Sequence, residues 1–211
     1  MNPDLHPEFR VLSPETITRV LGEAVNLLHT PGVKVGSPEA VDLLHSSGAS
    51  VNMDAGIASI PEELILKCLE SVPRNFSLVN LQGEKSVQYS GDKVHFNPGS
   101  SGVNILDSES LKHRPSQSAD LVNIIKIAEN LPVYDAQSTA VICHDVPEEI
   151  GDFYRLYLVL LLSRKPIVTG AFSIATSKVM FELLNIACAD SGNIGEYPRA
   201  VFDVCPSPPL Y

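Results

Sequence analysis

The second half of the chain repeats a β-rich segment followed by a helical segment at a nearly regular interval. The four apolar, β-rich segments start 40, 33 and 33 residues apart, near Lys93, Val133, Pro166 and Arg199. Helical patterns follow the first three segments, over residues 117–130, 147–163 and 177–189. Strand followed by helix at this interval is typical of parallel βαβ units, whose right-handed crossovers place helices outside and strands inside.

The number of residues per unit favours a barrel. Four units in about 119 residues extrapolate to roughly 240 residues for eight, the usual size of a β/α barrel. A doubly wound open sheet is the competing architecture, and it normally begins with a Gly-rich turn that enters a helix directly. Here the Gly-rich segment, residues 97–102, leads into more β-like chain. We therefore predict an α/β fold in which residues 91–211 form the N-terminal half of a TIM-type (β/α)8 barrel.

Residues 1–90 have a different pattern and are predicted to form a helical cap with short strands. Ser13 and Ser37 are each followed by Pro-Glu, which is typical of an N-cap, a proline at N1 and an acid in the first turn. Pro61 opens a third helix, and Gly48 is placed to end the second. Short β-like segments lie between and after these helices, at residues 33–35, 50–52, 57–60, 76–81 and 87–89.

Charge and hydropathy exclude several classes of partner. With 15 Lys and Arg against 25 Asp and Glu, the chain carries a net charge of -10, which repels nucleic acid and anionic membranes. The longest apolar run, residues 156–162, falls far short of the roughly 20 residues of a bilayer span. The first ten residues have no apolar core of a secretory signal. We expect a cytoplasmic protein whose four separated cysteines stay reduced.

The predicted binding site lies at the carboxyl ends of the strands, where barrel enzymes place their chemistry. The Gly-rich segment Asn97-Pro98-Gly99-Ser100-Ser101-Gly102 follows the first strand, and a simple turn is the alternative interpretation. The other strand ends are small or polar and uncharged, which favours a site that positions a substrate. The candidate substrate-binding residues are Asn97, Gly99, Ser100, Gln137, Thr169, Gly170, Cys205 and Ser207.

Other chemistry-bearing patterns are interpreted as structural. Cys143-His144-Asp145 is not expected to be a catalytic triad, because neighbours in sequence point in different directions. Asp145 is instead predicted to cap the helix that begins at Val146-Pro147, with Glu148 completing a capping box. The six histidines lack metal-ligand spacing, so we predict no metal site. Aromatic residues near the strands could hold a quaternary ammonium, but core packing is the preferred interpretation.

Short motifs in order along nearly the whole chain resemble the trimethylamine:corrinoid methyltransferase family and its quaternary-amine relatives. They are Leu12-Ser13-Pro14-Glu15, Thr30-Pro31-Gly32-Val33-Lys34-Val35, Leu43-Leu44-His45-Ser46-Ser47-Gly48-Ala49-Ser50-Val51, Ile60-Pro61-Glu62-Glu63-Leu64, Phe96-Asn97-Pro98-Gly99, Arg114-Pro115, Asp145-Val146-Pro147, Lys165-Pro166, Gly170-Ala171-Phe172 and Cys205-Pro206-Ser207-Pro208-Pro209-Leu210. Each motif alone is weak, and their order and spacing carry the resemblance.

The resemblance implies a TIM barrel that binds a methylated amine and passes a methyl group to the cobalt of a cobalamin carried by a separate corrinoid protein. Trimethylamine members contain pyrrolysine in the second half of the barrel, and relatives without it act on glycine betaine and other quaternary amines. This chain ends before that position, so no catalytic residue is assigned.

A half barrel has two unpaired sheet edges, so we expect this chain alone to be catalytically inert and to self-associate, as a homo-oligomer or otherwise. Two alternatives stay open: another barrel enzyme with downstream catalytic residues, and a non-catalytic fragment or assembly module.

Overall fold

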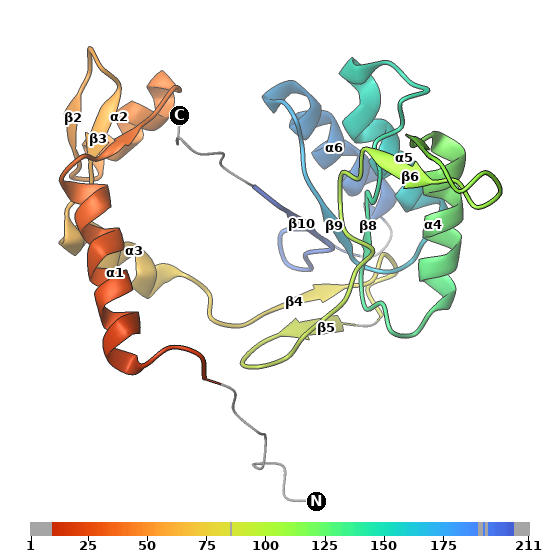
Figure 1. Cartoon of the computed structure of the whole chain (residues 1–211), viewed down its shortest axis with the longest axis horizontal. Helices are drawn as coiled ribbons and strands as arrows, with labels where there is room; N and C mark the ends of the chain where they lie inside the picture. The colour runs from red at the N-terminus through yellow and green to blue at the C-terminus, as the bar shows by residue number, and fades with distance from the viewer. Residues whose placement is uncertain (1–9, 85, 190–191, 193, 205–211) are drawn as a thin grey trace, which may run out of the picture. The chain divides into compact units, whose positions relative to one another are not determined.

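The computed structural model describes residues 10–84, 86–189, 192 and 194–204, and this part of the chain contains both helices and strands (Figure 1). Contacts divide the chain into two units, with the boundary between Val72 and Pro73. The hairpin formed by residues 76–89 therefore groups with the second unit. The predicted domain boundary near residue 90, between the helical cap and the half barrel, stays a prediction.

The first unit contains three helices and a small antiparallel sheet, and its helix starts follow the predicted signals. Its elements are α1 (Pro14–His29), β1 (Val33–Lys34), α2 (Pro38–Ser46), β2 (Ser50–Asn52), β3 (Ile57–Ser59) and α3 (Glu62–Ser71). The strand order is β1-β3-β2. The Ser13 hydroxyl accepts a hydrogen bond from the Thr16 N–H at 3.2 Å, and the Ser37 hydroxyl accepts one from the Ala40 N–H at 3.3 Å. Both predicted N-caps are confirmed.

Gly32 joins α1 to β1 in a conformation that other residues rarely adopt. Its φ is +68°, and a Cβ built there would lie 2.5 Å from the Ala58 carbonyl oxygen. Gly32→Ala is expected to lower the free energy of unfolding by about 2–4 kcal/mol, because it combines backbone strain with overpacking. Urea denaturation measures the change. Gly36→Ala is the matched control, since a Cβ at Gly36 meets nothing within 4 Å. Equal stability of the two variants would contradict the prediction.

In the described residues, the second unit contains the parallel strands, three α-helices and a 3-10 helix. In chain order its elements are β4 (Phe76–Val79), β5 (Ser86–Tyr89), β6 (Asn104–Leu106), β7 (His113–Pro115), α4 (Ser118–Asn130), β8 (Gln137–Ser138), the 3-10 helix η1 (Glu148–Ile150), α5 (Gly151–Leu162), β9 (Ile167–Thr169), α6 (Ile174–Ala187) and β10 (Ala200–Phe202). The predicted alternation of strand and helix is confirmed from α4 to β10.

Four consecutive segments run parallel to one another. The strands β8, β9 and β10 pair in the order of the chain, and both pairings are parallel. The segment before them meets the β8 segment only at two isolated parallel bridges, Phe96 with Tyr134 and Gly102 with Val141. Within the described residues these strands do not close into a barrel. The mixed α/β class and the parallel sheet are therefore confirmed, and the barrel is not.

The core of the second unit lies between the parallel strands and the helices α4, α5 and α6 (Figure 1). Leu121, Ile125, Leu156, Ile167 and Leu184 have no exposed surface there. Within β9, Ile167 and Thr169 are buried while Val168 is only half-buried, so successive side chains alternate between two faces of the sheet. None of the helices in the described residues is both long and apolar enough to cross a membrane.

The predicted role of Asp145 as the cap of its own helix is wrong. Its Oδ1 atom accepts hydrogen bonds from the Ser118 N–H at 2.8 Å and from the Ser118 hydroxyl at 3.1 Å. Asp145 therefore satisfies an N–H group in the first turn of α4. The segment after Asp145 begins with η1, and neither η1 nor α5 has a side-chain cap.

Candidate functional site

The most accessible group of predicted site residues lies after Phe96, between the two bridges that join the first parallel segment to the β8 segment. We call residues 97–102 the first strand-end loop. The Asn97 side-chain oxygen accepts a hydrogen bond from the Gly99 N–H at 2.8 Å. Gly99 has a φ of +84° and Ser101 a φ of +58°. Gly99 and Ser100 are exposed, and Asn97 is half-buried. A non-glycine residue at positive φ is the kind of strain that clusters at ligand sites.

The first strand-end loop lies against the end of β8. The Ser101 N–H donates to the Thr139 carbonyl at 3.3 Å, and the Gly102 N–H donates to the Ala140 carbonyl at 2.9 Å. The Ser138 hydroxyl donates to the Gly99 carbonyl. These bonds fix the position of the loop relative to the neighbouring strand.

Two predicted site residues are fully buried and already have partners within the fold. The Gln137 side-chain amide donates to the Ile125 carbonyl of α4 at 3.1 Å, so it is turned toward the helices. The Thr169 hydroxyl lies 3.0 Å from the Thr139 hydroxyl. The Gln137 side chain joins β8 to α4, and the Thr169 side chain joins the end of β9 to the residue after β8. Their contact with a substrate stays a prediction.

Gly170 allows β9 and β10 to approach each other closely where they end. A Cβ on Gly170 would lie 3.1 Å from the Asp203 carbonyl oxygen, and the Asp203 N–H donates to the Thr169 carbonyl at 2.7 Å. This contact accounts for the glycine without a ligand. The remaining predicted site residues, Cys205 and Ser207, lie outside the described residues.

Sequence reasoning missed a buried ion pair behind the strand ends. Asp152 and Arg155 are each 1% exposed, and the Arg155 Nη2 atom lies 3.5 Å from the Asp152 Oδ1 atom. Burial lowers the pKa of Arg155, and the charge of Asp152 opposes that shift. The sequence feature that could have indicated this pair is the presence of two opposite charges, three residues apart, in the otherwise apolar sequence of α5. A pair at this spacing is also common on exposed helix faces, so the sequence did not mark it as buried.

Cys143, His144 and Asp145 do not form a triad, as expected. The Cys143 side chain is buried, and that burial raises the pKa of its thiol. The His144 Nδ1 atom faces the Ser116 carbonyl at 3.2 Å, while Asp145 binds Ser118. Within the described residues, no group of three or more His, Cys, Asp or Glu side chains could hold a metal ion.

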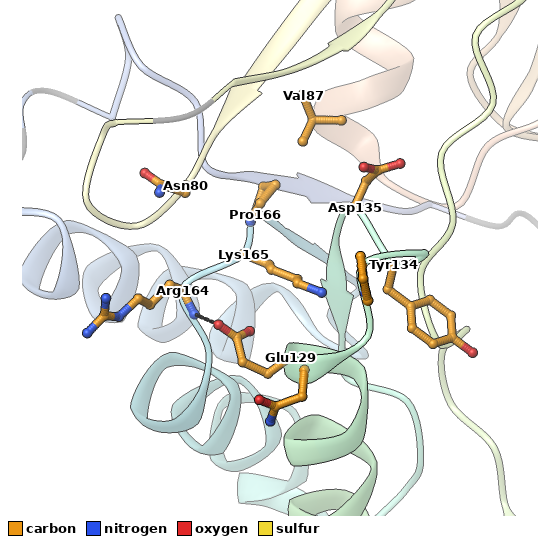
Figure 2. Close-up of a pocket in the computed structure, with 10 residues that line it drawn as sticks. Asn80, Val87, Glu129, Tyr134, Asp135, Arg164, Lys165 and Pro166 are labelled. Carbon is orange, nitrogen blue, oxygen red and sulfur yellow. Dashed lines mark hydrogen bonds between the residues drawn. The ribbon is translucent and has the colours of Figure 1, made fainter.

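A pocket of about 350 Å³ lies at the opposite end of the strands, among residues that precede β8 and β9 (Figure 2). Glu129 in this pocket accepts hydrogen bonds from the Ser163 hydroxyl and from the Arg164 N–H. The Lys165 ammonium donates to the Ala128 carbonyl at 2.6 Å and to the Leu131 carbonyl at 2.9 Å. Both charged groups are therefore bound to other groups of the protein around the C-terminal end of α4. We therefore keep the carboxyl ends of the strands as the candidate site.

Beside this pocket, His95 lies between two hydrogen-bond acceptors. Its Nδ1 atom is 2.9 Å from a carboxylate oxygen of Asp135, and its Nε2 atom is 2.8 Å from the Gln88 carbonyl. Only the imidazolium can donate to both acceptors at once. The bond with Asp135, followed by that with Gln88, raises the pKa of His95, while partial burial and, to a smaller extent, the charge of Lys93 oppose the shift.

We expect His95 to make the stability of the chain depend on pH. Because the folded state raises its pKa, the stabilisation is fully present below the unfolded value near 6.5 and is lost as pH rises through the folded value. His95→Asn should therefore cost on the order of 1 kcal/mol at pH 6 and less at pH 9. Urea denaturation at the two pH values measures this, with exposed His113→Asn as the control. A cost for His95→Asn that is independent of pH would contradict the prediction.

Comparison with known proteins identifies the family. A model of the family described as "Trimethylamine methyltransferase (MTTB)" matches residues 3–208. A trimethylamine methyltransferase MttB of Desulfitobacterium hafniense is 21% identical over 198 residues, which cover 94% of this chain and 40% of that relative. An MttB of Methanosarcina barkeri is 26% identical over 139 residues, which cover 63% of this chain and 28% of that relative.

The similarity therefore concerns less than half of each of these relatives. The matched part spans about 40% of the length of the Desulfitobacterium protein and less of the Methanosarcina one. Because the family model matches nearly the whole chain, the chain belongs to the trimethylamine methyltransferase (MTTB) family.

Proposed function

We propose that this chain contributes to a methyltransferase that moves a methyl group from a methylated amine, such as trimethylamine or glycine betaine, to a corrinoid protein. The observation that carries the proposal is the family match over residues 3–208. The relatives are named trimethylamine methyltransferases, which supports a tertiary amine as the first substrate to test.

The proposal includes a TIM-type barrel, of which residues 91–211 supply the first four βα units. Three strands pair in parallel and in chain order, and a fourth segment joins them through parallel bridges. The helices α4, α5 and α6 pack on these strands through one core. Sequential parallel strands with their helices on one side are the arrangement from which a β/α barrel is built.

The proposed substrate site lies at the carboxyl ends of these strands and uses the predicted residues Asn97, Gly99, Ser100, Gln137, Thr169, Gly170, Cys205 and Ser207. In the part that the structure describes, the accessible members lie on the first strand-end loop, which carries small side chains and backbone amides. Such groups can orient an amine and leave space for a flat ring beside it. A site whose proposed members are small or polar and uncharged acts by positioning the methyl carbon and the departing amine.

The corrinoid would be held by a separate partner protein, and its cobalt supplies the nucleophile that accepts the methyl group. This chain would contribute the surface against which the partner presents its cofactor. We place the reaction in the cytoplasm.

The function is tested with the full-length gene product that contains this sequence, a corrinoid protein and a series of methylated amines. We expect methylation of the corrinoid, followed by its visible spectrum, with trimethylamine or with a quaternary amine such as glycine betaine. Ser100→Trp should raise KM at least tenfold, because a large side chain on the exposed loop would obstruct the site. The exposed residue Lys126 on α4 provides the control Lys126→Gln. No transfer from any amine would refute the function and favour an assembly module or a different barrel enzyme.

We also propose that the chain self-associates. Val94, Phe96 and Val103 are 72%, 55% and 52% exposed, and they belong to the least regularly paired of the parallel segments. An exposed apolar segment beside a sheet favours association. Light scattering after size exclusion should give a mass of two or more chains, and a monodisperse monomer would contradict the proposal.

A further inference from the structure

One buried carboxylate holds the loop between β9 and α6, residues 170–173, which we call the second strand-end loop. Asp152 lies in the first turn of α5, and its Oδ2 atom accepts two hydrogen bonds. The Phe172 N–H donates to it at 2.6 Å, and the Thr176 hydroxyl donates to it at 2.7 Å. The carboxylate therefore fixes both the second strand-end loop and the first turn of α6.

Arg155, one helical turn further along α5, ties the same loop to the end of β8. Its Nη1 atom donates to the Thr139 carbonyl at 3.2 Å, and its guanidinium carbon lies 4.9 Å from the centre of the Phe172 ring. The planar guanidinium can bond in its plane and stack on an aromatic ring at the same time, which a lysine cannot do. Arg155 thus sets the position of Phe172 relative to Thr139.

Thr139 also links the two strand-end loops to each other. Its carbonyl accepts the Ser101 N–H of the first strand-end loop as well as the Arg155 Nη1 group. Its hydroxyl contacts the Thr169 hydroxyl directly before the second strand-end loop. A shift of the ion pair would therefore move both loops together.

We propose that Asp152 and Arg155 are positioning residues for the substrate site, acting through the first and second strand-end loops. This rests on the proposed function, because it assumes that the carboxyl ends of the strands bind the amine. Neither residue touches substrate. Both are buried behind the loops, and the loops carry the accessible groups. Reaction rates fall steeply when reacting groups are misplaced, by up to about 100-fold for 1 Å.

The test compares the full-length gene product that contains this sequence with its double variant Asp152→Leu/Arg155→Met. Replacing a buried ion pair by apolar residues of similar volume often keeps the fold intact. The variant loses the bonds to Phe172, Thr176 and Thr139. We expect a cooperative thermal transition and unchanged circular dichroism, together with at least tenfold faster amide hydrogen exchange in residues 170–176. We also expect a kcat at least tenfold lower, with a smaller change in KM.

Two further variants distinguish a positioning role of the ion pair from a nonspecific effect of substitution on the enzyme. Arg155→Lys retains the charge but not the planar fork, so it should recover part of the lost kcat. Glu182→Gln changes an exposed acid of α6 and should match the wild type in exchange and in kinetics. Wild-type exchange rates in the double variant would overturn the proposal, and so would faster exchange with unchanged kcat.

The failure of the proposed function would be recognised separately. In that case the wild-type polypeptide would transfer no methyl group and bind no amine by calorimetry. The exchange measurement would still decide whether the ion pair orders residues 170–176.

Discussion

Replacing Arg155 by alanine is expected to lower the free energy of unfolding by about 3–5 kcal/mol, because it leaves the Asp152 carboxylate buried without its cation. Asp152 would keep its bonds from the Phe172 N–H and the Thr176 hydroxyl, and these bonds limit the loss. The Thr139 carbonyl would lose one donor but keep the Ser101 N–H. Urea denaturation followed by circular dichroism measures the change.

Arg164→Ala provides the matched control for Arg155→Ala. Arg164 is an exposed arginine of the same unit, and its bond to Glu129 comes from its backbone N–H, which alanine retains. The control should change the free energy of unfolding by less than about 0.5 kcal/mol. If Arg155→Ala cost no more than Arg164→Ala, the ion pair would not be a significant source of stability.

Leu156→Ala is the second substitution with a large expected effect, a loss of about 2–5 kcal/mol. Leu156 lies in α5 with no exposed surface, and it packs in the core cluster of the second unit. Shortening it removes buried methyl groups and leaves a cavity that the surrounding strands and helices refill only in part. The unfolding midpoint in urea should fall while the slope of the transition stays the same.

Leu161→Ala tests whether burial, rather than helix propensity, causes that loss. Leu161 lies in the same helix but is 60% exposed. Alanine has a slightly higher helix propensity than leucine, so this variant should differ from the wild type by less than about 1 kcal/mol. A similar loss in both variants would contradict the assignment of the core.

The parts of the fold that depend on neighbouring residues could be predicted from the sequence. Ser13 and Ser37 each accept a hydrogen bond from an N–H three residues later, so the signal and its structure lie within one turn. The alternation of strands and helices from α4 to β10 was predictable for a similar reason, since each element has its own apolar pattern. Whether the strands close into a barrel depends on contacts that no local pattern records.

The errors arose where a side chain binds a distant segment. Asp145 has a plausible helix start directly after it, yet it binds Ser118, which is 27 residues earlier. The first strand, predicted to begin near Lys93, pairs at one isolated bridge, Phe96 with Tyr134, and the second bridge, Gly102 with Val141, lies at the end of the predicted Gly-rich segment. Between them lie Pro98, which has no N–H to donate, and two residues at positive φ, Gly99 and Ser101.

The candidate site was located by general reasoning about strand ends rather than by its individual residues. The exposed loop containing Gly99 and Ser100 agrees with a binding role. The side chains of Gln137 and Thr169, in contrast, are buried and already form hydrogen bonds within the protein. The contacts of Asp152 and Arg155 could not be inferred from the sequence, because these side chains bind Phe172 and Thr139, which are distant in the sequence and lie beside α5 only after folding.

Both ends of α4 are completed by residues that the ribosome adds much later. Its first turn receives the Asp145 carboxylate 27 residues after Ser118, and its last carbonyls receive the Lys165 ammonium 34 and 37 residues after Leu131 and Ala128. At about 5–20 residues per second, the Lys165 contacts become available roughly 2–7 seconds after the end of the helix is synthesised. During translation the C-terminal end of α4 is therefore expected to fray until the start of β9 has been made, whereas Asp120 already binds the Gln117 N–H at its first turn.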